Sequence, residues 1–237
     1  MNDRVYFRQW LSGRDFATDD RVARQMVNFV YAIGDRETGE AVLVDAAYAP
    51  AELVEKLTLD EMSIVGTLST HYHPDHVGGS MMGETIAGLV ELLEVADVPV
   101  HVQGTEVDWI TRATGVQGDS LVAHQSGDVV RVGDVEITLI HTPGHTPGSQ
   151  CFLVEGCLVS GDTLFLDGCG RTDLPGSDPE EMYRSLTEQL ARISGDTILY
   201  PGHNYSAERS APLASVRRDN YALAPVGAEQ WLAMFAR

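Results

Sequence analysis

Seven residues of this 237-residue chain, five histidines and two aspartates, form a set of candidate ligands for divalent metals. Four of the seven fall within six residues, in the segment Thr70–His76, which reads Thr-His-Tyr-His-Pro-Asp-His. Imidazole and carboxylate together suit zinc, iron or manganese, and the lack of nearby cysteine argues against a closed thiolate zinc site. The candidate ligands are His71, His73, Asp75, His76, His145, Asp162 and His203.

The other three candidate ligands lie in short segments rich in glycine or proline. They are Gly144–Ser149, Ser160–Thr163 and Pro201–His203, and each follows an apolar run. Glycine and proline fix sharp turns, which let the backbone come close to a metal and aim a side chain at it. The seven side chains suffice for two adjacent metals with open coordination positions.

The elements that must position these residues alternate between strands and helices. A helix is expected over 179–193, where apolar residues recur at helical spacing and Asp178 can cap the first turn. A second helix is expected over 50–57. Strands are expected where β-branched and apolar residues form runs. These runs are 27–33, 41–44, 64–69, 98–102, 135–140, 151–154, 158–160 and 197–200.

A weak internal repeat organises these elements. Residues 29–45 and 152–162 both read as strand, turn, strand and aspartate, and each is followed by a helix, a strand and a histidine. Two similar halves would each contribute a sheet with helices outside, and the histidines would meet where the sheets adjoin. We therefore predict one α/β domain over 1–237, a four-layered αββα sandwich with two mixed sheets and halves of about 27–140 and 150–237.

Composition narrows the functions and the location. The formal net charge is -19, so nucleic acid is not expected as a substrate or partner. A hydrophobic content of 43% is enough for a substantial core. No run of about 20 apolar residues that could span a bilayer is present, and the first ten residues do not lead into a signal peptide. A cytoplasmic protein without membrane contact is expected.

The ordered set of ligand motifs resembles the metallo-beta-lactamase superfamily, whose pattern His-x-His-x-Asp-His, His, Asp, His is matched from about residue 28 to residue 205. The resemblance implies two divalent metal ions, with zinc expected and iron or manganese as alternatives. It assigns the ligands as follows: His71, His73 and His145 to the first metal, Asp75, His76 and His203 to the second, and Asp162 as the bridge.

The resemblance also implies a mechanism. Two divalent cations about 3.5 to 4 Å apart lower the pKa of a shared water and polarise the scissile carbonyl, so no side-chain nucleophile is needed. Asp75 would orient the attacking water, which together with the bridging Asp162 makes these two carboxylates the expected catalytic residues.

The loop from Thr163 to Gly176 is similar to loops of two branches of the superfamily. Its Gly-Cys-Gly-Arg-Thr-Asp sequence resembles that of glyoxalase II thioester hydrolases and, more closely, that of persulfide dioxygenases. Both branches act on thiol conjugates, so a small-molecule thioester or thiol conjugate is the expected substrate. By the same resemblance Arg171 would clamp an anion, and Cys169 and Tyr205 would contact substrate.

Three functions remain open at the level of sequence. The first is a metal-dependent hydrolase of a thioester or of a related ester or lactone. The second is a persulfide dioxygenase with a single iron, held by His71, His145 and Asp162. The third is a metal-stabilised binding protein without catalysis. The presence of all seven ligands favours the hydrolase.

Two segments depart from the resemblance. The 34 residues after His203 are too few for the helical domain with which typical glyoxalase II enzymes bind glutathione, so glutathione is not the expected carrier. Residues 79–98 form an insertion that we predict to be an apolar helix, serving as a lid, a substrate wall or plain core. At the C-terminus, Trp231 to Phe235 would close the core or meet a second subunit, which leaves a homodimer open.

Overall fold

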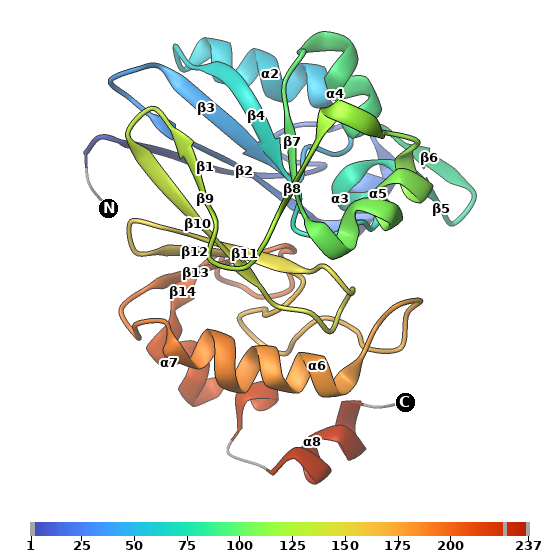
Figure 1. The fold of residues 1–237 in the computed structure, drawn as a ribbon, viewed down its shortest axis with the longest axis vertical. Coiled ribbons are helices and arrows are strands. Elements are labelled where there is room, and N and C mark those ends of the chain that lie inside the picture. Colours follow the sequence, from blue (N-terminus) through green and yellow to red (C-terminus); the bar gives the residue numbers. More distant parts are fainter. Residues whose placement is uncertain (1–2, 225–226, 236–237) are drawn as a thin grey trace.

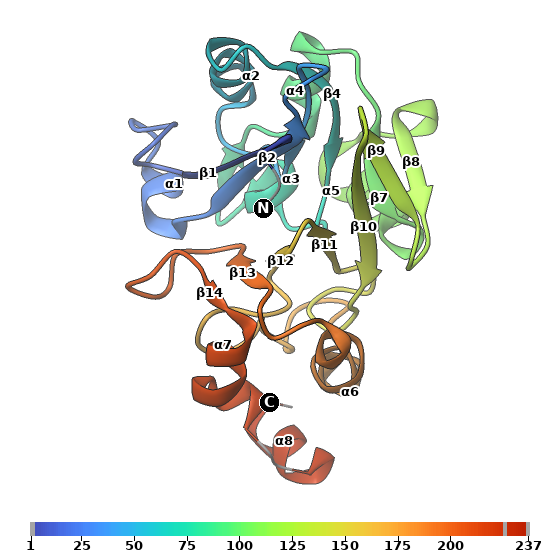
Figure 2. The same cartoon turned by 90° about the vertical axis from the view of Figure 1, so that its left-hand side faces the viewer.

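The computed structural model describes residues 3–224 and 227–235. Two six-stranded sheets lie face to face in it, and helices cover their outer faces (Figure 1). In the second view, α2 and α4 lie above one sheet, and α6, α7 and α8 lie below the other (Figure 2). The predicted four-layered αββα sandwich is therefore confirmed. No helix of the described residues is long and apolar enough to cross a membrane.

The first sheet has the strand order β1-β2-β3-β4-β7-β8. Its β1–β2 and β2–β3 pairs are antiparallel, and the pairs from β3 to β8 are parallel. The bounds of its strands are β1 Val5–Leu11, β2 Phe29–Asp35, β3 Glu40–Val44, β4 Ser63–Leu68, β7 Val100–Gln103 and β8 Leu121–His124.

The second sheet has the order β14-β13-β12-β11-β10-β9. Its β12–β13 pair is parallel, and its other pairs are antiparallel. The strand bounds are β9 Val129–Val132, β10 Val135–His141, β11 Gln150–Val154, β12 Cys157–Gly161, β13 Ile198–Pro201 and β14 Ala211–Pro212. The repeat in the sequence thus corresponds to one arrangement made twice, in which an antiparallel hairpin is followed by a parallel strand.

The helices are short and lie mostly on the outer faces. The predicted helix over 179–193 is present as α6, which continues without a break through a wider turn at Ser185–Gln189 and a tighter one at Leu190–Arg192. The bounds of the α-helices are α1 Arg21–Met26, α2 Pro50–Leu59, α3 Pro74–Val77, α4 Leu89–Val95, α5 Val107–Thr114, α6 Pro179–Arg184, α7 Leu213–Asp219 and α8 Ala228–Phe235.

The core has separate layers because successive strand residues point to opposite faces of a sheet. In β2, Phe29, Tyr31 and Ile33 pack between the two sheets, whereas Val30 and Ala32 pack under the helices of the first sheet. All five side chains are fully buried. A strand buried on both faces must be apolar throughout, which is why such strands were visible in the sequence.

The segment 79–98 is not one helix, and that prediction is wrong. Its first part is a hairpin of β5 (Gly79–Met81) and β6 (Glu84–Ile86), and only Leu89–Val95 is helical. The hairpin turn places Met82 at a φ of 54° and Gly83 at 82°, a left-handed conformation that a helix does not use. The apolar residues at helical spacing therefore serve two different elements.

Trp231 closes the core of the second sheet. It is 1% exposed, and its indole N–H donates to the carbonyl of Ala222 over 2.9 Å. It packs with buried side chains of α6 and β13 in one apolar cluster. Met234, in contrast, is 40% exposed. The homodimer remains a prediction.

Candidate metal centre

The seven predicted ligands converge on one point where the two sheets adjoin. Four of them follow β4 of the first sheet, and the other three follow β10, β12 and β13 of the second sheet. Backbone hydrogen bonds from Phe29 to Gly202 (2.8 Å) and from Asn204 to Val27 (2.9 Å) hold the loop of His203 against β2. The side chains that meet are His71, His73, Asp75, His76, His145, Asp162 and His203.

The first group of ligands is made of three histidines from two loops. The candidate donor atoms of His71, His73 and His145 lie within 4.8 Å of one another. The Nδ1 atom of His73 is 3.0 Å from the Nε2 atom of His145. Nε2 of His71 is buried and has no hydrogen-bond partner. Three imidazole nitrogens therefore face a common point.

The second group is made of Asp75, His76 and His203. Nε2 of His203 lies 3.3 Å from Nε2 of His76 and 3.4 Å from Oδ2 of Asp75. The carboxylate of Asp162 lies between the groups, because its Oδ2 is 3.2 Å from Nε2 of His203 and 3.6 Å from Nε2 of His145. Asp162 thus occupies a bridging position between the two groups.

These residues fit a pair of divalent cations. Buried polar atoms are almost always hydrogen-bonded, yet Nε2 of His71 and Oδ1 of Asp162 are buried without a partner among the described residues. Five imidazoles and two carboxylates are donors that zinc, iron and manganese accept.

Electrostatics keep the first group neutral. Burial, reinforced by the neighbouring histidines, lowers the pKa of His71 well below its usual range, and burial lowers the pKa of His73 to about 3. Burial also lowers the pKa of His145. A neutral imidazole has the free electron pair that metal binding requires.

The pKa of His76 is raised rather than lowered, because nearby carboxylates outweigh the effect of burial. Burial would lower the pKa of His76, yet the carboxylates of Asp75, Asp162 and Asp45 raise this pKa to about 10. In return, the histidines hold the pKa of Asp162 well below its usual range despite burial. Asp162 is therefore ionised at neutral pH, and its charge attracts either a proton on His76 or a cation.

Asp45 and Thr70 orient two of the histidines from outside the cluster. Nδ1 of His76 donates to Oδ2 of Asp45 over 2.9 Å, and Nδ1 of His71 donates to the hydroxyl of Thr70 over 2.9 Å. The Thr70 hydroxyl donates in turn to Asp45 over 2.6 Å. These bonds fix the tautomers that leave both Nε2 atoms facing the cluster. Sequence reasoning missed both residues as part of the site.

The ring orientations of His145 and His203 are set by backbone carbonyls. Nδ1 of His145 donates to the carbonyl of Arg171, and Nδ1 of His203 donates to that of Met26, each over 2.8 Å. The loop of Arg171 packs so tightly here that a Cβ at Gly170 would lie 2.9 Å from Nδ1 of His145. Glycine is required at this close approach.

Glu106 connects two of the ligand loops and was also missed. It is 1% exposed and lies at the end of a single helical turn, Gly104–Glu106. Its carboxylate accepts from the backbone N–H of Tyr72 (2.8 Å), the hydroxyl of Thr146 (2.7 Å) and the backbone N–H of Gly148 (2.6 Å). These partners flank His71, His73 and His145, so Glu106 fixes the spacing of the first ligand group.

His141, four residues before His145, supports the His145 loop without a hydrogen bond to a candidate ligand. Its Nε2 donates to the carbonyl of Pro147 over 2.9 Å. This bond closes the loop that bears His145 rather than orienting the imidazole of His145. The imidazole instead has Arg171 as its partner.

A cavity of about 620 Å³ opens from the cluster, and all three predicted substrate residues line it. The Tyr205 ring stacks on His203 with ring centres 4.7 Å apart. Arg171 is exposed, and its guanidinium is paired with Asp173 over 2.8 Å. Met81 and Met82 of the β5–β6 hairpin also line the cavity. The insertion therefore forms part of the cavity wall.

Comparisons with known proteins agree with this geometry. A family model described as the metallo-beta-lactamase superfamily matches residues 24–203. The human mitochondrial persulfide dioxygenase ETHE1 is 32% identical over 209 residues, 84% of this chain and 74% of that protein. A hydroxyacylglutathione hydrolase of Polaromonas sp. is 34% identical over 185 residues, 75% of this chain and 62% of that protein. The structure of ETHE1 from Myxococcus xanthus matches with a TM-score of 0.80 at 25% identity, covering 98% of this chain and 90% of that one.

Proposed function

Because this chain belongs to the metallo-beta-lactamase superfamily, we propose that it hydrolyses a thioester, or a related ester or lactone, of a small thiol conjugate and uses two divalent cations. The names of its relatives point to an enzyme, either a hydrolase or a dioxygenase. The expected cations are zinc, with iron or manganese as alternatives.

The complete second ligand group is the observation that supports the hydrolase. A single-metal site of His71, His145 and Asp162 has no need of Asp75, His76 and His203. These three are nevertheless buried, and their donor atoms lie within 4.8 Å of one another. Burying a carboxylate and two imidazoles without a use for them costs free energy, so a second cation is the simplest reason for their presence.

Two bound cations would supply a water of lowered pKa and polarise the scissile carbonyl. The residues of the chain then position the reactants. Asn28 donates to Oδ2 of Asp75 over 3.0 Å and is itself fixed by the hydroxyl of Tyr48, which donates to it over 2.8 Å. Asp75 is thereby held in the orientation needed to align a water and to accept its proton. The cavity beside it, lined in part by Phe165 and Tyr205, holds the thiol conjugate.

A persulfide dioxygenase is the second candidate. The identity to human ETHE1 and the Gly-Cys-Gly-Arg-Thr-Asp sequence of residues 168–173 favour it. Such an enzyme would hold one iron with His71, His145 and Asp162, and oxygen would be its co-substrate.

Metal analysis with two assays separates the candidates. Protein purified without chelator or added metal should contain two divalent ions per chain and should release free thiol from an acyl-thiol. One iron per chain with oxygen uptake on a persulfide would instead establish the dioxygenase. Bound metal without turnover in either assay would leave a binding protein and contradict both enzymes.

A further inference from the structure

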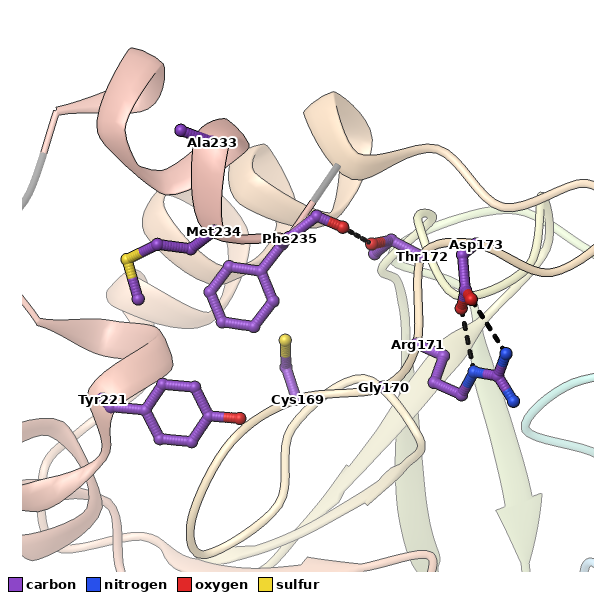
Figure 3. Close-up of a pocket in the computed structure, with 9 residues that line it drawn as sticks. All are labelled: Cys169, Gly170, Arg171, Thr172, Asp173, Tyr221, Ala233, Met234 and Phe235. Carbon is purple, nitrogen blue, oxygen red and sulfur yellow. Dashed lines mark hydrogen bonds and ion pairs between the residues drawn. The ribbon is translucent and has the colours of Figure 1, made fainter. Parts of the chain in front are cut away.

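A second cavity of about 550 Å³ lies beside the metal centre, between the loop after β12 and helix α8 (Figure 3). Its floor is the loop segment 169–173, and its other walls are Tyr221 and three residues of α8. The lining residues are Cys169, Gly170, Arg171, Thr172, Asp173, Tyr221, Ala233, Met234 and Phe235. Nothing in the chemistry proposed above requires this space.

The second cavity adjoins the cavity of the metal centre. Cys169, Arg171 and Tyr221 line both of them. A molecule whose reactive bond lies at the cluster can therefore extend past these three side chains toward α8. Each cavity alone has the volume of a small-molecule site, which commonly measures about 300 to 1,000 Å³, so the two together offer room for an elongated ligand.

The walls near α8 are aromatic and apolar. The rings of Tyr221 and Phe235 stack with an angle of 8° and a centre distance of 5.8 Å. The thiol of Cys169 points toward the Phe235 ring (Figure 3). Burial raises the pKa of this thiol to about 12, so at neutral pH it forms an uncharged part of the cavity wall. Met234 completes this surface.

The charged groups of the second cavity cancel each other. Arg171 is the one cationic side chain among the described residues that line it. Its guanidinium donates to both carboxylate oxygens of Asp173, each over 2.8 Å, and this leaves little positive potential for a phosphate. The net charge of the chain, -19, disfavours a polyanion further.

We propose that this second cavity binds an uncharged apolar or aromatic arm of the substrate. The arm belongs either to the acyl group or to the thiol, and both offer the same chemistry to the walls. The inference rests on the proposed function, because it places the reactive bond of the same substrate at the metal centre.

Two series of thioesters test the proposal and distinguish the two sources of the arm. One series joins acetyl or phenylbutanoyl to N-acetylcysteamine, and the other joins acetyl to ethanethiol or to phenylbutyl thiol. In one of them kcat/KM of the wild-type protein should be at least about tenfold higher for the long substrate, since the cavity would bury several methylenes and a ring. Equal values for long and short substrates in both series would overturn the inference and leave the hydrolase intact.

A matched set of variants locates the preference in the second cavity. Met234→Asp puts a charge into the apolar wall and should reduce the ratio of long to short kcat/KM by at least about fivefold. Met234→Leu should keep the ratio. Leu59→Asp should keep it too, because it adds the same charge at an exposed position of α2. An unchanged ratio in Met234→Asp would contradict the assignment.

Direct binding tests the cavity separately from turnover. Calorimetric titration with phenylbutanol should show binding to the wild-type protein and to Met234→Leu, and binding at least about fivefold weaker to Met234→Asp. This result is expected even if no thioester is hydrolysed, in which case the proposed function fails and the apolar site stands. Equal binding to all three proteins, or binding to none, would overturn the site.

Discussion

Asp75 is a candidate metal ligand and, in the proposed function, the group that orients the reactants. Its carboxylate is 3.4 Å from His203 and accepts a hydrogen bond from Asn28. The same side chain is dispensable for a single iron held by His71, His145 and Asp162. Removing it therefore affects the two candidate reactions differently.

Asp75→Ala is expected to lower thioester hydrolysis by at least about 10²-fold, because losing even an outer partner of a metal site costs 10- to 100-fold. The far-ultraviolet circular dichroism spectrum should stay unchanged. Asp219→Ala, an exposed partner of Arg218, is the control and should keep full activity. Full hydrolytic activity in Asp75→Ala would refute the role of Asp75, and retained iron with oxygen uptake would support the dioxygenase.

Glu106 acts on the centre without touching a ligand. Glu106→Ala leaves the part-buried N–H of Tyr72 and the buried N–H of Gly148 without their acceptor. We expect the free energy of unfolding in urea to fall by about 2 kcal/mol. Metal affinity, measured by chelator competition, should fall with it, since the loops of His73 and His145 lose their common partner. Glu208→Ala, an exposed control, should change neither quantity, and an unchanged metal affinity in Glu106→Ala would contradict the positioning role.

The candidate ligands could be predicted from the sequence, whereas the supporting roles of Asp45 and Glu106 could not. The ligands lie in local motifs whose residue types and glycines indicate a metal. The contacts of Asp45 and Glu106 join residues more than 20 positions apart. Such contacts depend on the tertiary arrangement, and no local pattern marks them. The one available signal was the position of Asp45 directly after a buried strand.

At the scale of elements, eight strands and two helices were predicted to within two residues at each end, if the turns that continue α6 to Arg192 are counted with it. These elements could be recognised because a strand buried on both faces is apolar throughout, and a helix buried on one face has apolar residues at helical spacing. The β5–β6 hairpin and the edge strands β1, β8, β9 and β14 were missed. All of them except β1 are short, and none is buried along its whole length, so their apolar pattern is incomplete.

The start of α6 gives a prediction at this scale. The carboxylate of Asp178 accepts from the backbone N–H groups of Glu180 and Glu181 over 2.8 and 3.1 Å. Asp178→Ala should lower the free energy of unfolding in urea by about 1 kcal/mol, the usual contribution of such a cap. Glu188→Ala, an exposed position on the same helical segment, serves as the control. A loss no larger than that of the control would show that the cap does not stabilise the helix.

At the scale of the whole molecule, an ion pair joins the two sheets far from the metal centre. Asp35 ends β2 of the first sheet, and it accepts from the backbone N–H of Asp134, in the β9–β10 turn of the second, over 2.8 Å. Arg4 lies 2.7 Å from Asp35 and 2.6 Å from the carboxylate of Asp134. The organisation as one domain stays a prediction, and this contact gives a way to probe it.

Hydrogen bonding by Arg4 holds the pKa of Asp35 well below its ordinary value of 3.8. A carboxylate with a lowered folded-state pKa stabilises the protein above its unfolded-state pKa, and this stability is lost as pH falls through the folded-state pKa. Wild type should therefore exceed Asp35→Asn in free energy of unfolding at neutral pH, and the difference should shrink below about pH 4. Urea unfolding at several pH values, with Asp119→Asn as the control, measures this. A difference that grows toward acid pH would contradict the assignment.

The candidate ligands of the metal centre come from both sheets, four from the loop after β4 and three from loops of the second sheet. Neither half of the polypeptide can therefore present the complete coordination sphere before the sheets dock. During refolding, capture of a spectroscopically visible ion such as Co²⁺ should lag behind the formation of secondary structure and coincide with docking of the sheets. The rate of metal capture would then report the rate of the last folding step, in which the two sheets dock.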